Sequence, residues 1–152
     1  MKTLPAGELA PDFTLPDHRG FDHRLSVLLA QGPVMLFFYP TAASSGCTKE
    51  ACHFRDLAGE FAAHAGQRIG ISMDDVSTQA DFASQQSLDY PLLSDADGTV
   101  ATAFGVRRRF ITPVKRATFV IDRDGRIAEA ITSETSMTVH ADRALAALAR
   151  LA

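Results

Sequence analysis

The sequence has no tryptophan and only two cysteines among its 152 residues. Two cysteines are too few for the disulfide framework of a small secreted protein. No uninterrupted apolar run is longer than that of residues 34–39, which is far short of the ~20 residues that a membrane-spanning helix needs. Residues 1–11 lack the basic and apolar regions of a signal peptide. We therefore expect a cytoplasmic protein that has no membrane partner.

The chain also lacks an excess of positive charge. It has 15 basic and 18 acidic residues, so its formal net charge is −3. A general nucleic-acid-binding protein is normally basic, so this balance argues against nucleic acid as a partner. Hydrophobic residues make up 46% of the chain, which excludes an intrinsically disordered protein. The length fits a single domain over residues 1–152, and no repeat or linker divides it.

Hydrophobic patterning predicts strands and helices in alternation. The continuous apolar run within residues 33–40 is typical of a strand buried on both faces. Strands are expected over residues 33–40, 68–73, 91–94, 116–122 and 126–132, the last two as a hairpin. Helices are expected over residues 47–66, 78–87, 99–104 and 139–151. This order indicates an α/β fold with a central mixed β-sheet flanked by helices.

Cys47 lies where a buried strand is followed by a loop of small residues and then by a helix. Backbone N–H groups at a helix start carry partial positive charge, which favours a thiolate over a thiol. The thiolate is the nucleophilic form of cysteine, so this position favours reactivity. The hydroxyl of Ser44 and the cation of Lys49 are close in the sequence. A structural role for Cys47 stays open as the alternative, because cysteine is a common core residue.

Cys52 follows Cys47 on the same expected helix. Five residues turn a helix by ~140° and rise ~7.5 Å, which separates the two Cα atoms by ~8.7 Å. A disulfide needs Cα atoms within ~7 Å, so the pair can bond only after the first helical turns unwind. The spacing is not the Cys-x-x-Cys of disulfide oxidoreductases and zinc ribbons. A metal site at Cys47, Cys52 and His53 would need a fourth ligand from elsewhere.

Several other polar residues are expected at the surface. The isolated histidines are interpreted as surface residues: His18, His23, His64 and His140. Lys49 and Glu50 are interpreted as helix-surface or capping residues. The run of residues 107–110, Arg-Arg-Arg-Phe, is interpreted as solvated charge, with docking of an acidic reductase as the alternative.

Residues 38–52 read Phe-Tyr-Pro-Thr-Ala-Ala-Ser-Ser-Gly-Cys-Thr-Lys-Glu-Ala-Cys. This segment closely resembles the active-site stretch of peroxiredoxins, in the subgroup called bacterioferritin comigratory protein or peroxiredoxin Q. The family motif Pro-x-x-x-Thr/Ser-x-x-Cys is matched by Pro40, Ser44 and Cys47. Four further segments resemble family blocks in the same order: residues 10–15, 70–74, 91–95 and 116–122. The resemblance implies a thioredoxin-like fold with an N-terminal hairpin extension.

The same resemblance implies a thiol-dependent peroxidase for hydrogen peroxide and organic hydroperoxides, with a role in antioxidant defence. Cys47 would be the peroxidatic cysteine, which peroxide oxidises to a sulfenic acid. Cys52 would be the resolving cysteine, which forms an intramolecular disulfide with Cys47. A thioredoxin-like or glutaredoxin-like dithiol protein would then reduce that disulfide. No metal or other cofactor is implied, and the subgroup contains monomers and weak homodimers.

Arg116 matches the active-site arginine of the family. It would stabilise the Cys47 thiolate and bind the peroxide oxygen. Ser44 would hydrogen-bond the peroxide, and Pro40 would shield the thiolate from water. A surface salt bridge at a strand start is the alternative for Arg116. Two other functions use similar chemistry: a redox-sensing module without enzyme activity, and a protein disulfide oxidoreductase, against which the absence of Cys-x-x-Cys argues.

Overall fold

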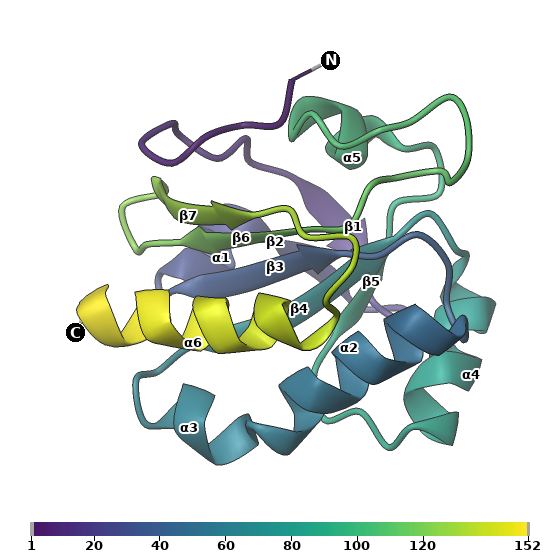
Figure 1. Ribbon diagram of the computed structural model, residues 1–152, viewed down its shortest axis with the longest axis horizontal. Coiled ribbons are helices and arrows are strands. Elements are labelled where there is room, and N and C mark those ends of the chain that lie inside the picture. The colour runs from purple at the N-terminus through teal and green to yellow at the C-terminus, as the bar shows by residue number, and fades with distance from the viewer. Residues whose placement is uncertain (1, 152) are drawn as a thin grey trace.

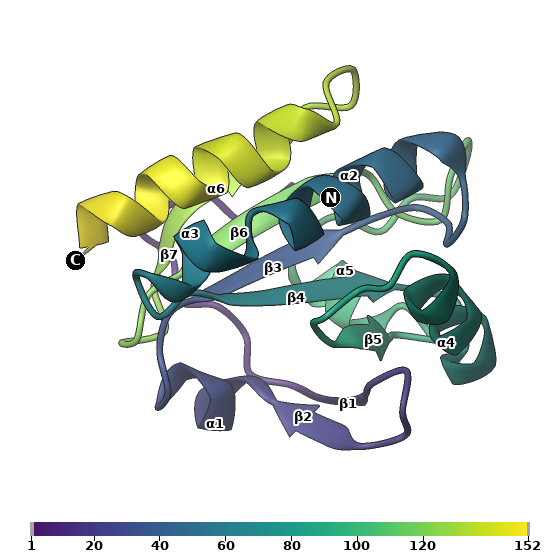
Figure 2. The same ribbon diagram turned by 90° about the horizontal axis from the view of Figure 1, so that it is seen from below.

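The computed structural model describes residues 2–151, with a central five-stranded β-sheet and helices on both of its faces (Figure 1). A separate antiparallel hairpin is formed by β1 (Thr14–Pro16) and β2 (Asp22–Arg24). The hairpin lies on the same side of the sheet as α1 (Leu25–Leu29) (Figure 2). The predicted α/β class and the N-terminal hairpin are both confirmed.

The main sheet has the strand order β5–β4–β3–β6–β7. β3 (Val34–Phe38) pairs in parallel with β4 (Gln67–Ser72), which pairs in parallel with β5 (Leu92–Ser94). On the other side, β6 (Ala117–Ile121) pairs antiparallel with β3, and β7 (Ile127–Ile131) pairs antiparallel with β6. The sheet is therefore mixed, as the sequence predicts.

The two longest helices and the short α3 lie on one face of this sheet. That face carries α2 (Ser45–Asp56), α3 (Ala58–Ala62) and α6 (Thr138–Leu151) (Figure 2). The opposite face is covered by α1 and by α5 (Thr99–Ala103), while α4 (Val76–Gln85) lies beside the edge strand β5. No helix within residues 2–151 is long and apolar enough to cross a membrane.

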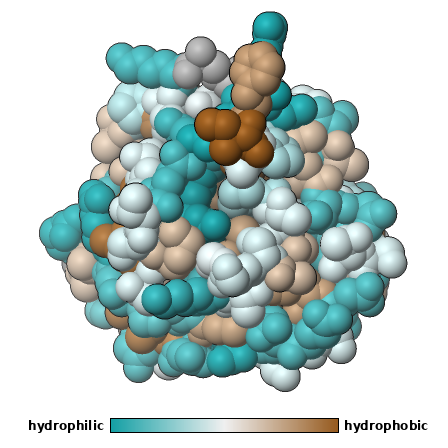
Figure 3. Space-filling view, turned by 45° about the vertical axis from the view of Figure 1, so that its right-hand side comes forward, coloured by the Kyte–Doolittle hydropathy of each residue, from teal (hydrophilic) through white to brown (hydrophobic). Residues whose placement is uncertain are grey.

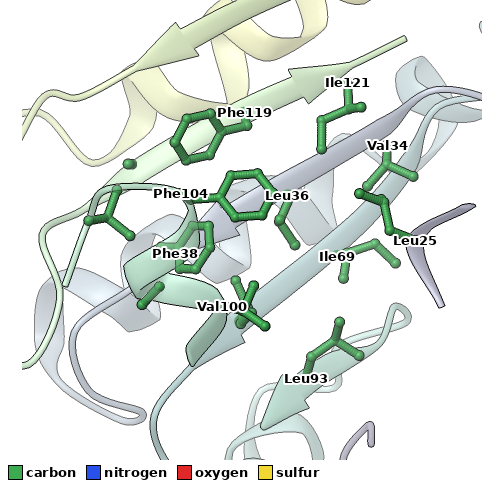
Figure 4. Packing of buried hydrophobic residues seen from close by; sticks show 14 of the residues in the cluster. Leu25, Val34, Leu36, Phe38, Ile69, Leu93, Val100, Phe104, Phe119 and Ile121 are labelled. Atoms are coloured by element: carbon green, nitrogen blue, oxygen red, sulfur yellow. The ribbon is translucent and has the colours of Figure 1, made fainter. Parts of the chain in front are cut away.

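The two faces of β3 belong to two separate hydrophobic clusters. Successive strand side chains point to opposite faces. Val34, Leu36 and Phe38 accordingly pack with α1 and α5, and Figure 4 shows them with Phe104 and Phe119. The alternate residues of the run, such as Phe37, pack under α2 and α6. Burial on both faces explains why this strand reads as a continuous apolar run in the sequence.

The prediction of one helix over residues 47–66 is wrong, because the structure contains two helices that meet at Leu57. The Arg68 guanidinium donates to the carbonyl oxygens of Phe54 at 3.0 Å and Arg55 at 3.5 Å. These carbonyls belong to the last turn of α2, where carbonyl groups have no intrahelical N–H partner. Since Arg68 comes from β4, the local sequence pattern does not reveal this helix end.

The register of the sheet brings two distant segments together at one end of β3. Phe38, the last residue of β3, pairs with Ala117 of β6. Arg116 therefore lies beside the point where the chain leaves β3 and enters the loop that leads to α2. The fold places the first turn of α2 next to this arginine.

Candidate active site

Cys47 lies in the first turn of α2 and is 1% exposed. Ser44 is the N-cap of this helix, with extended backbone angles, and its Oγ accepts a hydrogen bond from the Cys47 N–H at 3.3 Å. A serine at this position satisfies one of the free N–H groups of a helix start. The helix therefore begins at Ser45, two residues earlier than the sequence predicts, and Cys47 faces the positive end of the helix dipole.

Arg116 contacts both Cys47 and Glu50. Its Nη2 donates to Cys47 Sγ at 3.3 Å, and its Nη1 donates to Glu50 Oε1 at 2.7 Å. Arg116 is 7% exposed, so this contact is not the surface salt bridge that the sequence left as an alternative. A planar guanidinium presents several donors in a fixed arrangement, which allows one side chain to hold two groups at once.

Glu50 is fully buried, so the expectation of a surface position is wrong. Burial raises the pKa of Glu50 to about 8, and the positive charge of Arg116 opposes this shift. Within the described residues, Glu50 Oε2 has no hydrogen-bond partner. An ionised carboxylate would leave that oxygen unsatisfied, so the buried site favours a neutral Glu50 at pH 7.

His140 is also fully buried, which corrects the expectation that it lies at the surface. Its Nε2 lies 2.6 Å from the carbonyl oxygen of Ser133, which can only accept, so Nε2 carries the hydrogen. Its Nδ1 therefore accepts from the Thr118 hydroxyl at 2.8 Å. Burial lowers the pKa of His140 to about 4, so the ring is neutral at pH 7.

The carboxylate of Asp74, which follows β4, holds the loop before α2 by hydrogen bonds. Asp74 Oδ2 accepts hydrogen bonds from the Ala42 N–H at 2.8 Å and from the Ser72 hydroxyl at 2.7 Å. The next loop residue, Ala43, has a φ of 66°, a left-handed conformation that alanine rarely adopts. Pro40, half-buried at the loop start, precedes this bend. The sequence analysis missed Asp74, although it follows a parallel neighbour of β3 and so belongs to the same sheet edge.

Cys52 also belongs to α2 but is half-buried and points toward the end of α4. Its thiol donates to Gln86 Oε1 at 3.4 Å, whereas Cys47 contacts Arg116, so the two sulfurs have different surroundings. Both cysteines are free thiols. His53, the third residue of the metal alternative, pairs with Asp142 at 2.7 Å. Within residues 2–151, no group of three His, Cys, Asp or Glu side chains is placed to hold a metal ion.

The site therefore holds a buried thiol between a helix N-terminus and a guanidinium. Both groups favour negative charge on sulfur and on an oxygen that approaches it. A mixed sheet of this kind, carrying such a cysteine after its central strand, is the arrangement of thioredoxin-like thiol peroxidases. The fold and the site thus define a class of thiol-based redox enzymes.

Comparison with known proteins gives the family. Residues 6–130 match the model of the AhpC/TSA family, and the chain belongs to this family. A putative peroxiredoxin of Mycobacterium tuberculosis strain CDC 1551 is 59% identical over 148 residues, which cover 95% of this chain and 96% of the relative. Peroxiredoxin Bcp of Escherichia coli K12 is 38% identical over 133 residues, which cover 84% of this chain and 85% of the relative.

Solved structures give the same result. Peroxidoxin BcpB of Mycobacterium tuberculosis superposes with a TM-score of 0.94 at 56% identity, covering 98% of this chain and 99% of the other. Peroxiredoxin Q of Xanthomonas campestris superposes with a TM-score of 0.87 at 29% identity, covering 95% of this chain and 97% of the other. The chain is a peroxiredoxin of the bacterioferritin comigratory protein or peroxiredoxin Q group, and this family membership implies a thiol-dependent peroxidase.

Proposed function

We propose that Cys47 is the peroxidatic cysteine of a two-cysteine peroxidase in which Cys52 resolves the oxidised sulfur. The observation that carries this assignment is the 3.3 Å contact between Cys47 Sγ and Arg116 Nη2 at the start of α2. The Cys52 thiol instead donates to an amide oxygen of Gln86. Of the two cysteines, Cys47 therefore has the surroundings of a nucleophile.

In the first step, the Cys47 thiolate attacks one oxygen of a hydroperoxide. The S–O bond forms while the O–O bond breaks, and the leaving oxygen takes a proton to become water or an alcohol. Cys47 becomes a sulfenic acid, oxidised by two electrons, and the peroxide is reduced by two. Arg116 stabilises the negative charge that moves from sulfur to the leaving oxygen. Ser44 keeps its hydroxyl hydrogen available for the peroxide, since its Oγ only accepts from Cys47 N–H.

In the second step, the Cys52 thiol attacks the sulfenic sulfur and water leaves, which gives an intramolecular disulfide. Both cysteines are on α2, where helical geometry holds their Cα atoms too far apart to bond. The second half of α2 is anchored, because the Tyr90 hydroxyl donates to the Ala51 carbonyl at 2.7 Å and Arg68 caps the last turn. The first turns of α2 therefore unwind and carry Cys47 toward Cys52.

In the last step, a thioredoxin-like dithiol protein reduces the disulfide by thiol–disulfide exchange. One thiolate of the donor attacks a sulfur of the disulfide, and its second thiol releases the mixed disulfide. The protein regains two thiols, and α2 refolds around Cys47. Pro40 shields the reduced site from water at the start of the loop.

Thioredoxin-coupled turnover of hydrogen peroxide tests this assignment. We expect Cys47→Ser to abolish turnover, while Cys52→Ser retains one oxidation per chain and loses efficient recycling. Mass analysis of the wild type after one equivalent of peroxide should show an intramolecular disulfide. Turnover retained in Cys47→Ser would refute the assignment of the nucleophile, and full turnover in Cys52→Ser would refute the resolving role.

A further inference from the structure

The loop between α5 and β6 exposes two adjacent large apolar side chains. Phe110 is 79% exposed and Ile111 is 94% exposed. Figure 3, which brings the right-hand side of Figure 1 forward, shows a strongly hydrophobic projection at its upper edge with hydrophilic surface beside it. Single exposed apolar residues are common on proteins, but two adjacent ones at such exposure call for a physical account.

The backbone of this loop is built to present the two side chains. Arg107 and Val114 form an antiparallel bridge, and the Arg108 N–H donates to the Pro113 carbonyl at 2.9 Å. At the tip, the Thr112 N–H donates to the Phe110 carbonyl at 2.9 Å across the intervening residue.

The residue at the centre of that tight turn is Ile111, whose φ is 74°. A β-branched residue rarely adopts this left-handed conformation, and a three-residue turn of this form is strained. Strain of this kind is found where the surrounding structure imposes it, often at functional sites. Here the imposed geometry turns Ile111 away from the protein.

The loop is locally basic although the whole chain has a net charge of −3. The loop contains three consecutive arginines, residues 107–109, and Lys115 follows them. Arg108 pairs with Glu134 at 2.5 Å, and Arg109 is exposed next to Phe110. The local excess of cations fits an anionic partner.

We propose that residues 107–115 dock the protein onto an anionic lipid surface, with Phe110 and Ile111 entering the interface and the neighbouring cations contacting lipid phosphates. Aromatic and aliphatic side chains flanked by Arg and Lys are the features by which peripheral proteins bind such surfaces. This proposal departs from the sequence-based expectation of no membrane partner, which rested on the lengths of apolar runs. The length of an apolar run does not detect two exposed apolar residues at the tip of a loop.

Two other occupants fit the loop less well. A second copy of the chain in a symmetric contact would bring the arginines of both loops together, and like charges repel. A folded protein would need a pocket complementary to a convex tip, whereas a lipid surface deforms around it. Charge and shape together therefore favour lipid.

The docking loop is connected to the peroxidase site. Its last residue, Lys115, directly precedes Arg116, and Arg108 binds Glu134 in the segment between β7 and α6. Met137 of that segment packs close to Gly46, the residue before Cys47. Docking is nevertheless independent of the proposed chemistry, because it requires neither cysteine.

Vesicle co-sedimentation of the reduced full chain tests the proposal. We expect binding to phosphatidylcholine vesicles that contain phosphatidylglycerol, weaker binding to phosphatidylcholine alone, and loss of binding as salt is raised. The double variant Phe110→Ser/Ile111→Ser should reduce the partition coefficient by at least about ten-fold. Arg109→Gln should weaken binding to the anionic vesicles more than to the neutral ones.

Phe21→Ser is the matched control, since Phe21 is also exposed, at 61%, and also lies beside an arginine, with its ring centroid 5.5 Å from the Arg19 guanidinium carbon. This variant should bind vesicles like the wild type, and circular dichroism confirms that each variant is folded. Equal binding by the double variant, or no binding by the wild type, would overturn the proposal. A shift from dimer to monomer in the double variant, measured by sedimentation equilibrium, would assign the loop to a second copy instead.

Discussion

Glu50 Oε2 lies 3.5 Å from Nδ1 of His140, and both side chains are fully buried. Because His140 donates its Nε2 hydrogen to the Ser133 carbonyl and accepts from the Thr118 hydroxyl at Nδ1, the ring offers no hydrogen to the carboxyl group. Within the described residues, an ionised Glu50 would therefore bury a charged oxygen that no donor satisfies. The geometry on this side agrees with burial in favouring the neutral acid.

A neutral Glu50 leaves the charge of Arg116 available for the sulfur. The buried group of Arg116, Glu50 and a Cys47 thiolate then has no net charge, which is the arrangement that burial penalises least. Glu50 Oε1 still accepts from Arg116 in this state and fixes the orientation of the guanidinium. Glu50 therefore positions Arg116 without neutralising it.

Glu50→Gln should change how stability depends on pH. The pKa of Glu50 rises from 4.5 to about 8 on folding, so the folded state holds the extra proton between these values and stability falls as pH rises through that window. His140 acts oppositely, since its pKa falls from 6.5 to about 4; most of its contribution is gained below pH 6.5, and the remainder is the same in the Glu50→Gln variant. Between pH 6.5 and 8 we expect the free energy of unfolding to fall by up to about 1.4 kcal/mol per pH unit, and Glu50→Gln should remove this fall.

Denaturant unfolding at pH 6.5 and 8 measures this difference. Both proteins should carry Cys47→Ser and Cys52→Ser, so that no thiol titrates in the window. The glutamine keeps an oxygen for Arg116 and is nearly the same size as glutamate, which preserves the packing. An equal fall in the free energy of unfolding with and without Glu50→Gln would show that Glu50 is ionised in the folded protein.

Arg116→Lys should slow the oxidation of Cys47 while keeping the charge. A lysine ammonium is a point charge and lacks the fixed fork with which Arg116 reaches Cys47 and Glu50 together. We expect the second-order rate with hydrogen peroxide to fall by about 10²-fold, the usual cost of one misplaced donor in a reacting site. Quenched-flow sampling with mass analysis gives the rate. Arg24→Lys, at an exposed ion pair with Asp12, is the control and should react like the wild type.

Asp74→Ala should loosen the loop that precedes Cys47. The Ala42 N–H and the Ser72 hydroxyl lose their shared acceptor, and we expect the free energy of unfolding to fall by about 1–3 kcal/mol. Asp74→Asn retains one acceptor oxygen and should lose less. Urea unfolding with an unchanged m-value checks the effect, and equal stability of Asp74→Ala and wild type would show that the loop does not depend on this carboxylate.

The sequence predicts the sheet and the position of Cys47 at a helix start well, because both depend on local pattern. A short apolar run buried on two faces identifies β3, and the small residues after it locate the start of α2. The same patterning could have found Glu50, since Cys47, Glu50, Ala51 and Phe54 follow the spacing of a buried helix face. His140 likewise adjoins Ala141 and Ala144 on the buried face of α6. Assigning these two polar residues to the surface by residue type caused both errors.

Other features depend on partners that are distant in the chain. Arg68 ends α2 from β4, and Asp74 holds the loop at Ala42 from beyond the same strand. No pattern within a single segment encodes these contacts. The five-residue α1 was also not predicted, because one turn and a half is too short to show a helical period.

The central claim is that Cys47 is an activated peroxidatic thiol. Its most direct test is the second-order rate at which reduced Cys52→Ser consumes hydrogen peroxide, with the product identified by mass. We predict a rate far above that of a free thiolate, with one oxygen added at Cys47. A rate no greater than that of a free thiolate, or oxygen at another residue, would contradict the account.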